Sequence, residues 1–255
     1  MNDALLEAVD LDVAVPGRVL VERLNCTLRR GEFMALLGGN GAGKSLLLRT
    51  LAGLRDAAAG VVKLDGKPIA TLARRAIAAR LGFLPQDPDA APQGRLHESV
   101  LLGRFAHLGF WEALDAADTA RATGALADVG LEALAGRELA TLSGGEQRRA
   151  AIARLLVQAP AVYLLDEPTN HLDPAQQLGI LERLRALTRA GAAVIASLHE
   201  PNLALRFADR ACLLQGDGSV EVVACAALGP AHLQRLYGLE YAEARIGPHR
   251  FLAAT

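Results

Sequence analysis

The sequence is poor in cysteine and has no excess of either charge. Its three cysteines, Cys26, Cys212 and Cys225, form no Cys-x-x-Cys pair, so we expect buried, reduced thiols rather than disulfides or a zinc site. Lys and Arg number 27 against 28 Asp and Glu. This balance lacks the basic excess typical of nucleic-acid-binding proteins, so no nucleic-acid partner is expected.

Long apolar runs are also missing. No uncharged apolar stretch reaches the roughly 18–20 residues that a membrane-spanning helix requires. The most apolar segments, 161–165 and 192–198, are only as long as strands. The start, Met1-Asn2-Asp3, lacks the basic and apolar regions of a secretory signal. We therefore expect the chain to stay in the cytoplasm.

The composition that remains, 51% hydrophobic and 22% charged, predicts a globular fold rather than a disordered chain. Short apolar runs alternate with helical patterns, which is typical of a parallel sheet covered by helices on both faces. We therefore expect an α/β fold with a mainly parallel sheet and an N-terminal antiparallel β annex. The strands expected in the sheet are 32–37, 81–84, 162–165 and 193–198, and those expected in the annex are 5–9, 19–28 and 61–64.

The stretch between residues 90 and 158 has a different character, because strand patterns give way to alanine-rich helical ones, notably at 113–129. We interpret it as an inserted α-helical subdomain that the chain enters through a loop at 86–92. The expected units are a core at 1–89 and 159–225, the helical subdomain at 90–158, and a short C-terminal extension at 226–255 with a helix at 226–237 and a strand at 240–246.

Residues 38–45, Gly-Gly-Asn-Gly-Ala-Gly-Lys-Ser, fit the phosphate-loop pattern G-x-x-x-x-G-K-[ST] between a predicted strand and a predicted helix. In such a loop the backbone N–H groups point at phosphates, and the helix N-terminus adds partial positive charge. Lys44 would reach the β- and γ-phosphates, and the Ser45 hydroxyl would ligate Mg²⁺. The alternative is a glycine-rich turn without a ligand. The expected nucleotide contacts in this loop are Gly38, Gly39, Asn40, Gly41, Ala42, Gly43, Lys44 and Ser45.

Two further motifs follow in the order of a known family. Residues 142–149 read Leu-Ser-Gly-Gly-Glu-Gln-Arg-Arg, and residues 162–173 read Val-Tyr-Leu-Leu-Asp-Glu-Pro-Thr-Asn-His-Leu-Asp. With the phosphate loop, Gln86 and His199, they make the sequence resemble the ATP-binding-cassette (ABC) ATPases over nearly its whole length. The resemblance implies a P-loop NTPase core, ATP and Mg²⁺ as cofactors, and ATP hydrolysis.

Four polar side chains each lie just past the carboxyl end of a predicted parallel strand or share that turn, at the edge where open α/β sheets bind ligands. Asp166 would hold Mg²⁺ through water. Glu167 would polarise the attacking water, His199 would bond the γ-phosphate, and Gln86 would sense it through the metal or the water. Taken singly, each has a plainer alternative, such as a solvated turn or a capping residue. The expected catalytic residues are Lys44, Gln86, Glu167 and His199, and the expected metal contacts are Ser45, Gln86 and Asp166.

Ser143 and Glu146 form a capping-box pattern at the start of a predicted helix, and Asp173 before Pro174 fits an N-cap. These local roles do not compete with a ligand, because a capped helix N-terminus beside glycines is also an anion site. The resemblance implies a head-to-tail homodimer with two ATP molecules at its interface. The residues that it places at this interface are Ser143, Gly144, Gly145 and Glu146, which would face the partner's γ-phosphate, and Asp173, in the loop that links the two sites.

Two expected nucleotide contacts depart from the family pattern. Val15 stands where an aromatic side chain usually stacks on adenine, so the base contact there would be plain apolar packing. Leu46 follows Ser45 where threonine is common, which removes a hydrogen bond to the α-phosphate. Neither residue is among the hydrolytic groups, so ATPase activity is still expected.

Residues 100–111, Val-Leu-Leu-Gly-Arg-Phe-Ala-His-Leu-Gly-Phe-Trp, follow Gln86 in the region through which the family contacts a membrane permease. Their Leu-Gly-Arg, aromatic, His and Gly pattern resembles the ATPases of bacterial importers for ferric siderophores, haem and cobalamin, as does Leu236-Tyr237-Gly238. The opening at 95–100 departs from that group's usual Thr-Val. The plainer alternative for Phe105, Phe110 and Trp111 is ordinary helix packing.

The expected function is therefore the ATP-hydrolysing subunit of a bacterial ABC importer, held peripherally at the cytoplasmic face of the inner membrane. Its partners would be a second copy of itself, permease subunits that dock on the region Gln86–Trp111, and, indirectly, an extracytoplasmic substrate-binding protein. The alternatives are an efflux ATPase and a soluble ABC ATPase without a transport role. Cargo would be chosen by the permease and the binding protein.

Overall fold

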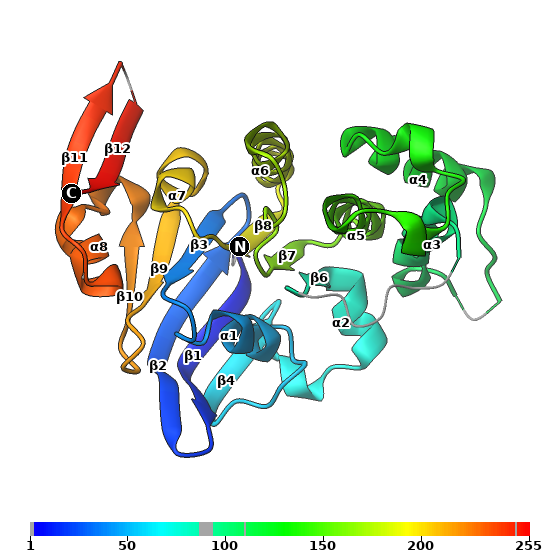
Figure 1. The fold of residues 1–255 in the computed structure, drawn as a ribbon. Helices are drawn as coiled ribbons and strands as arrows, with labels where there is room; N and C mark the ends of the chain where they lie inside the picture. Colours follow the sequence, from blue (N-terminus) through cyan, green and yellow to red (C-terminus); the bar gives the residue numbers. More distant parts are fainter. Residues whose placement is uncertain (1–2, 87–93, 110, 248) are drawn as a thin grey trace.

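The computed structural model describes residues 3–86, 94–109, 111–247 and 249–255 (Figure 1). Its main sheet has six strands, of which the five from β9 to β6 pair in parallel while β10 pairs antiparallel with β9. The four strands expected in the parallel sheet are confirmed to within a residue or so at each end, because apolar runs buried on both faces are distinctive. The order is β10 (Val220–Ala224), β9 (Arg210–Leu214), β3 (Phe33–Gly38), β8 (Ala193–Ser197), β7 (Val162–Leu165) and β6 (Leu81–Leu84).

The antiparallel annex is confirmed, although its first strand is longer than the expected 5–9. A bulge interrupts the strand's pairing between Ala8 and Leu11, where Asp10 takes a left-handed φ of 45°. The bulge breaks the alternation of apolar residues, which is why the sequence pattern stops there. Gly60 lies against it, and a Cβ there would come within 2.2 Å of the Asp10 carbonyl oxygen. The annex strands, in spatial order, are β2 (Arg18–Arg29), β1 (Ala4–Val15), β4 (Ala59–Leu64) and β5 (Lys67–Pro68).

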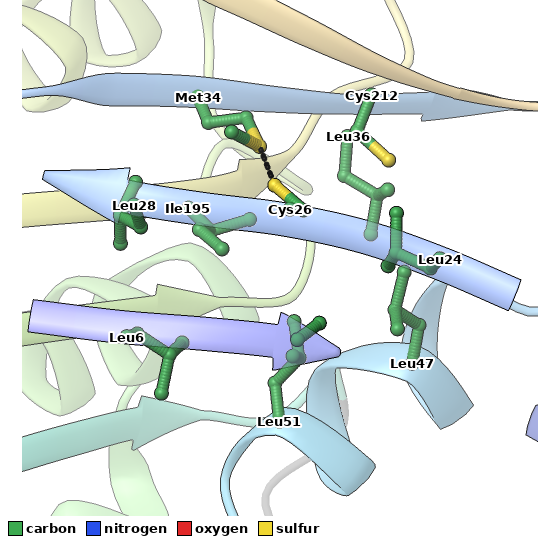
Figure 2. A pocket seen from close by; sticks show the side chains of 11 residues that line it. Leu6, Leu24, Cys26, Leu28, Met34, Leu36, Leu47, Leu51, Ile195 and Cys212 are labelled. Atoms are coloured by element: carbon green, nitrogen blue, oxygen red, sulfur yellow. Dashed lines mark hydrogen bonds between the residues drawn. The ribbon is translucent and has the colours of Figure 1, made fainter. Parts of the chain in front are cut away.

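The annex and the main sheet enclose an apolar core together with helix α1 (Lys44–Leu51), as Figure 2 shows. Within it lies a cavity of about 20 Å³. Cys26 and Met34 meet there with their sulfur atoms 3.7 Å apart. Because α1 follows the phosphate loop directly, this core fixes the loop between the two sheets. The side chains around the cavity that Figure 2 labels are Leu6, Leu24, Cys26, Leu28, Met34, Leu36, Leu47, Leu51, Ile195 and Cys212.

Helices pack on the opposite face of the main sheet and form a second apolar cluster with it. The expected helix at 113–129 starts only at Ala116, because the Asp115 side chain accepts a hydrogen bond from the Asp118 N–H (2.8 Å) and caps it. None of the helices in the described parts of the chain is long and apolar enough to cross a membrane. The helices with residues in this cluster include α3 (Leu96–Leu101), α4 (Ala116–Asp128), α5 (Gly144–Gln158), α6 (Pro174–Arg189) and α7 (Pro201–Phe207). Helix α2 (Arg74–Arg80) instead buries Ile77 in the first core.

The C-terminal part contains helix α8 (Pro230–Tyr237) and a hairpin of β11 (Tyr241–Ile246) and β12 (His249–Ala254). The expected helix at 226–237 starts late because residues Cys225–Ala227 form a separate 3₁₀ turn. The expected strand at 240–246 is present as β11, while β12, β9 and β10 were not expected. In the expected hinge at 86–92, residues 87–92 lie outside the described residues, as does Phe110.

Candidate functional site

The carboxyl ends of four neighbouring strands, β3, β8, β7 and β6, border one cavity of about 490 Å³. Because these strands are parallel, the segments that follow them leave the sheet at the same edge. The phosphate loop, Gln86, Glu167 and His199 meet there, as their positions after the strands predict. The described residues that line the cavity are Leu20, Asn40, Gly41, Gly43, Lys44, Ser45, Leu46, Gln86, Glu167, Asn170 and His199.

The phosphate loop turns into α1 at Gly43, which has a left-handed φ of 101°. The buried Lys44 Nζ donates to the carbonyl oxygens of Gly38 (2.8 Å) and Gly39 (3.0 Å). Burial lowers the pKa of Lys44, and the nearby carboxylates of Glu167 and Asp166 oppose that shift. The loop therefore presents backbone N–H groups and one buried cation, the combination that binds phosphates.

The Glu167 carboxylate is held from three sides and is almost completely buried, with 8% of its side chain exposed. His199 Nε2 lies 2.7 Å from Oε1. Gln86 Nε2 donates to Oε2 (3.1 Å), and Asn170 Nδ2 donates to the same oxygen (2.8 Å). The Glu167 backbone is left-handed, with φ at 50°. Segments that follow β6, β7 and β8 thus converge on one carboxylate at the cavity wall.

Asp166 lies behind this wall rather than in it. Its side chain is buried, and Oδ1 accepts a hydrogen bond from Ser197 Oγ (2.7 Å). The same Ser197 oxygen accepts from the Glu167 N–H (2.7 Å). One hydroxyl in β8 therefore fixes both acidic residues after β7.

The residues expected to contact a metal fit Mg²⁺ by the chemistry of their donors. Ser45, Gln86 and Asp166 offer a hydroxyl, an amide and a carboxylate oxygen, and Mg²⁺ commonly takes few protein ligands beside waters and phosphate oxygens. Among the residues that the structure describes, no cluster of three or more His, Cys, Asp or Glu could hold a metal alone. A metal here would therefore share its coordination with the phosphates.

The capping roles expected at residues 143–146, which we call the signature segment, and at Asp173 are confirmed. The Ser143 N–H donates to Glu146 Oε2 (2.7 Å), and the Glu146 N–H donates back to Ser143 Oγ (3.3 Å). Asp173 caps α6 by accepting from the Gln176 N–H (2.9 Å), with Pro174 at the first helical position. Gly145 packs against the loop before α6, since a Cβ there would lie 2.9 Å from the His171 carbonyl oxygen.

The signature segment and Asp173 lie apart from the nucleotide cavity of their own chain. Residues 143–146 and Asp173 are not among the described residues that line it. Ser143, Gly144 and Asp173 are exposed to solvent. Within one chain the structure therefore joins the phosphate loop, Gln86, Glu167 and His199, and leaves the signature segment on the outer surface.

The sequence reasoning missed three residues at the site. Leu20 lines the cavity beside Gly43. Of the two apolar contacts that were expected, Leu46 lines the cavity and Val15 does not. Nothing in the pattern of β2 distinguishes Leu20 from other apolar strand residues. Asn170 stands three residues after Glu167, and Ser197 is the polar residue of an apolar run, two residues before His199.

The fold and this cavity define a nucleotide-binding ATPase of the phosphate-loop class.

Comparison with known proteins gives the family. The ABC transporter family model matches residues 21–170. The hemin import ATP-binding protein HmuV of Rhodopseudomonas palustris is 43% identical over 219 residues, which is 83% of this chain and 79% of that protein. A transporter described as metal-chelate type, solved in an inward-facing conformation, has a TM-score of 0.82 at 27% identity and covers 99% of this chain and 97% of its own. The dimeric bacterial ABC transporter cassette MJ0796 has a TM-score of 0.79 at 27% identity, over 88% and 100%.

The chain belongs to the ABC transporter family, and it is an ATP-binding subunit with ATPase activity.

Proposed function

We propose that the chain energises a separate membrane permease of a bacterial importer, and that the cargo is haem, an iron–siderophore or a cobalamin-type compound. The observation that carries the hydrolytic part is the cavity shared by Lys44, Ser45, Gln86, Glu167 and His199. The import and cargo part rests on the likeness to a hemin import ATP-binding protein and on the Leu-Gly-Arg pattern at 102–104.

Nucleotide binding is assigned to the phosphate loop. The backbone N–H groups of residues 39–45 and the Lys44 ammonium would bind the β- and γ-phosphates, because they form the local concentration of donors and positive charge. Leu46 and Leu20 supply apolar cavity wall. Mg²⁺ would be held by Ser45 and Gln86 in the cavity lining and, through water, by Asp166 behind it, and it would neutralise charge on the phosphate oxygens.

Hydrolysis is assigned to Glu167 and the groups around it. The carboxylate would orient the attacking water and accept its proton, since it is fixed at the cavity wall by Gln86, Asn170 and His199. His199 is placed to bond the γ-phosphate from the end of β8. The chemistry needs positioning and charge stabilisation more than covalent participation.

The active form would be a head-to-tail homodimer. The signature residues Ser143–Glu146 lie outside the cavity of their own chain and form a capped, exposed helix N-terminus, which is an anion site. A second copy would place this segment over the γ-phosphate of the first, with Asp173 in the loop that links the two sites.

We divide the chain into the core (1–89 and 159–225), the helical subdomain (90–158) and the C-terminal extension (226–255).

The permease would dock on the helical subdomain, beside the nucleotide cavity. Phe105 is 54% exposed, and Trp111, at 92%, has the highest exposure among the exposed large apolar side chains of the described residues. A groove that Phe105 lines together with Phe83, Leu102 and Arg154 would give a partner helix a place to bind. Docking there would hold the chain peripherally at the cytoplasmic face of the inner membrane, with cargo delivered by an extracytoplasmic binding protein.

Two experiments test these assignments. The variant Glu167→Gln should retain ATP binding and form a stable dimer with ATP but lose phosphate release; wild-type release would remove Glu167 from its role. For the cargo, the chain is co-purified with its permease, and vesicles containing the complex are supplied with haem and the binding protein. ATP-dependent haem uptake supports the proposal. Outward movement would favour an efflux system, and a complex without any transport would favour a soluble ABC ATPase.

A further inference from the structure

Arg148, in the second turn of α5, is only 5% exposed although it carries a charge. Its guanidinium donates to four backbone carbonyl oxygens. Nη1 bonds Pro85 (2.5 Å) and Gln86 (3.1 Å), and Nη2 bonds Asp166 and Glu167 (2.8 Å for the latter). The first pair belongs to the segment that leaves β6, and the second pair to the end of β7. One rigid, multidentate cation therefore ties together two segments that are about eighty residues apart in sequence.

These are the segments that carry Gln86 and Glu167, whose side chains bond each other across the cavity wall. Glu167 has the left-handed φ of 50°, which is costly for a residue with a Cβ and persists only when its surroundings fix it. Ser197 holds its N–H, and Arg148 holds its carbonyl oxygen. Arg148 thus provides one of the backbone restraints on the turn Asp166–Glu167, where the Asn170 N–H also donates to the Glu167 carbonyl oxygen (3.1 Å) and the Asp166 N–H donates to that of Leu84 (2.8 Å).

The same arginine is part of the helix that begins with the signature segment. Ser143 caps α5, and Arg148 follows five residues later on the same rigid helix. We propose that Arg148 is a positioning residue. It couples the position of α5 to the positions of Gln86 and Glu167, so that a movement of α5 displaces the Glu167 carboxylate. This rests on the proposed hydrolytic role of Glu167.

The neighbouring arginine provides a matched control. Arg149 Nη1 donates to the carbonyl oxygen of Val129, at the end of α4 (3.1 Å). That contact lies between two helices of the helical subdomain, away from β6 and β7. Replacing Arg149 removes the same charge from the same helix without touching the restraint on Glu167.

The test compares Arg148→Gln, Arg148→Lys and Arg149→Gln in the full chain, by steady-state ATPase kinetics and equilibrium ATP binding. We expect Arg148→Gln to lower kcat by about tenfold or more while the Kd for ATP stays within about twofold. Arg148→Lys should recover part of the loss, because an ammonium group keeps the positive charge but lacks the planar, multidentate set of donors of a guanidinium group. Arg149→Gln should behave like the wild type. Adding Arg148→Gln to Glu167→Gln should slow the reaction no further.

Several results would overturn the coupling. They are a folded Arg148→Gln variant with kcat within about twofold of wild type, an equal loss in Arg149→Gln, or a loss that follows a matching rise in Kd. If Arg148→Gln does not fold, wild-type kcat in Arg148→Lys overturns it. These results leave the proposed function standing as long as Glu167→Gln is inactive. Wild-type turnover in Glu167→Gln overturns the proposed function, and the coupling with it.

Discussion

His199 Nε2 lies 2.7 Å from Oε1 of Glu167 and joins the ends of two adjacent parallel strands, β8 and β7. The two partners differ in exposure, since 47% of the histidine side chain but only 8% of the glutamate side chain meets solvent. Both residues line the cavity, and the imidazole is the more accessible of the two. A group in this place can contact a ligand in the cavity while it orients the neighbouring carboxylate.

Replacing this imidazole should damage turnover more than binding. We expect His199→Ala to lower kcat by about a hundredfold, with a small change in the Kd for ATP, because the phosphate loop remains intact. Steady-state ATPase assays with equilibrium nucleotide binding measure both. His171→Ala, at an exposed histidine outside the cavity lining, serves as the control. Wild-type kcat in His199→Ala would contradict the role.

Lys44 should matter chiefly for nucleotide affinity. Removing a charge-assisted hydrogen-bond donor costs about 1.5–3 kcal/mol, so Lys44→Ala should raise the Kd for ATP by about ten- to a hundredfold. Titration with a fluorescent ATP analogue measures this. Lys67→Ala, at an exposed lysine of the annex, should leave the affinity unchanged. Full affinity in Lys44→Ala would mean that another group is the main phosphate ligand.

The proposed permease-docking surface, the groove that Phe105 lines, can be tested by placing a charge on it. Phe105→Asp should prevent co-purification with the permease and leave the ATPase activity of the free chain unchanged, because Phe105 is exposed and lies outside the cavity lining. Leu239→Asp is the matched control, since Leu239 is exposed to nearly the same extent, 55% against 54% for Phe105. Equal permease recovery with both variants would move the docking surface elsewhere.

Because of its buried cysteine thiols, we expect the protein's free energy of unfolding to fall at alkaline pH. Burial raises the pKa of Cys26 from 9.0 to about 11 and that of Cys225 to about 12, and it raises the pKa of Cys212 further. Between pH 9 and 11 the unfolded chain loses thiol protons that the folded chain retains, so the free energy of unfolding falls as the pH rises.

Urea unfolding over this pH range measures the alkaline effect, and Cys26→Ala should make the decline shallower. The same pKa shifts make the native thiols slow to react with an alkylating reagent at pH 8, since the thiolate is the reactive form. Unfolding in urea should remove this protection. Rapid alkylation of the folded protein would contradict it.

Much of the fold could be predicted because its strands have distinctive patterns. Phe33–Gly38 and Val162–Leu165 are buried on both faces and read as unbroken apolar runs. The strand Arg210–Leu214 was missed because it opens with an arginine, which pairs with Glu32. The strand Val220–Ala224 is a half-buried edge strand, and such strands carry a weak signal.

The candidate site was predictable where a motif links residue type to a strand end, as for Lys44, Glu167 and His199. The groups that position them could not be found in this way. Arg148 and Ser197 act through contacts with segments far away in sequence, and such contacts have no local spacing rule. Leu20 reaches the cavity in place of the expected Val15 because of how the hairpin of β1 and β2 lies beside Gly43.

The left-handed backbone at Glu167 has a consequence for how this protein can change over time. A residue with a side chain in that conformation costs on the order of 1–3 kcal/mol, and glycine would avoid most of the cost. Selection for thermal robustness alone would therefore favour a residue without a carboxylate at this position. The glutamate there marks a place where the chain gives up robustness, and attempts to engineer a heat-resistant form should leave this turn untouched.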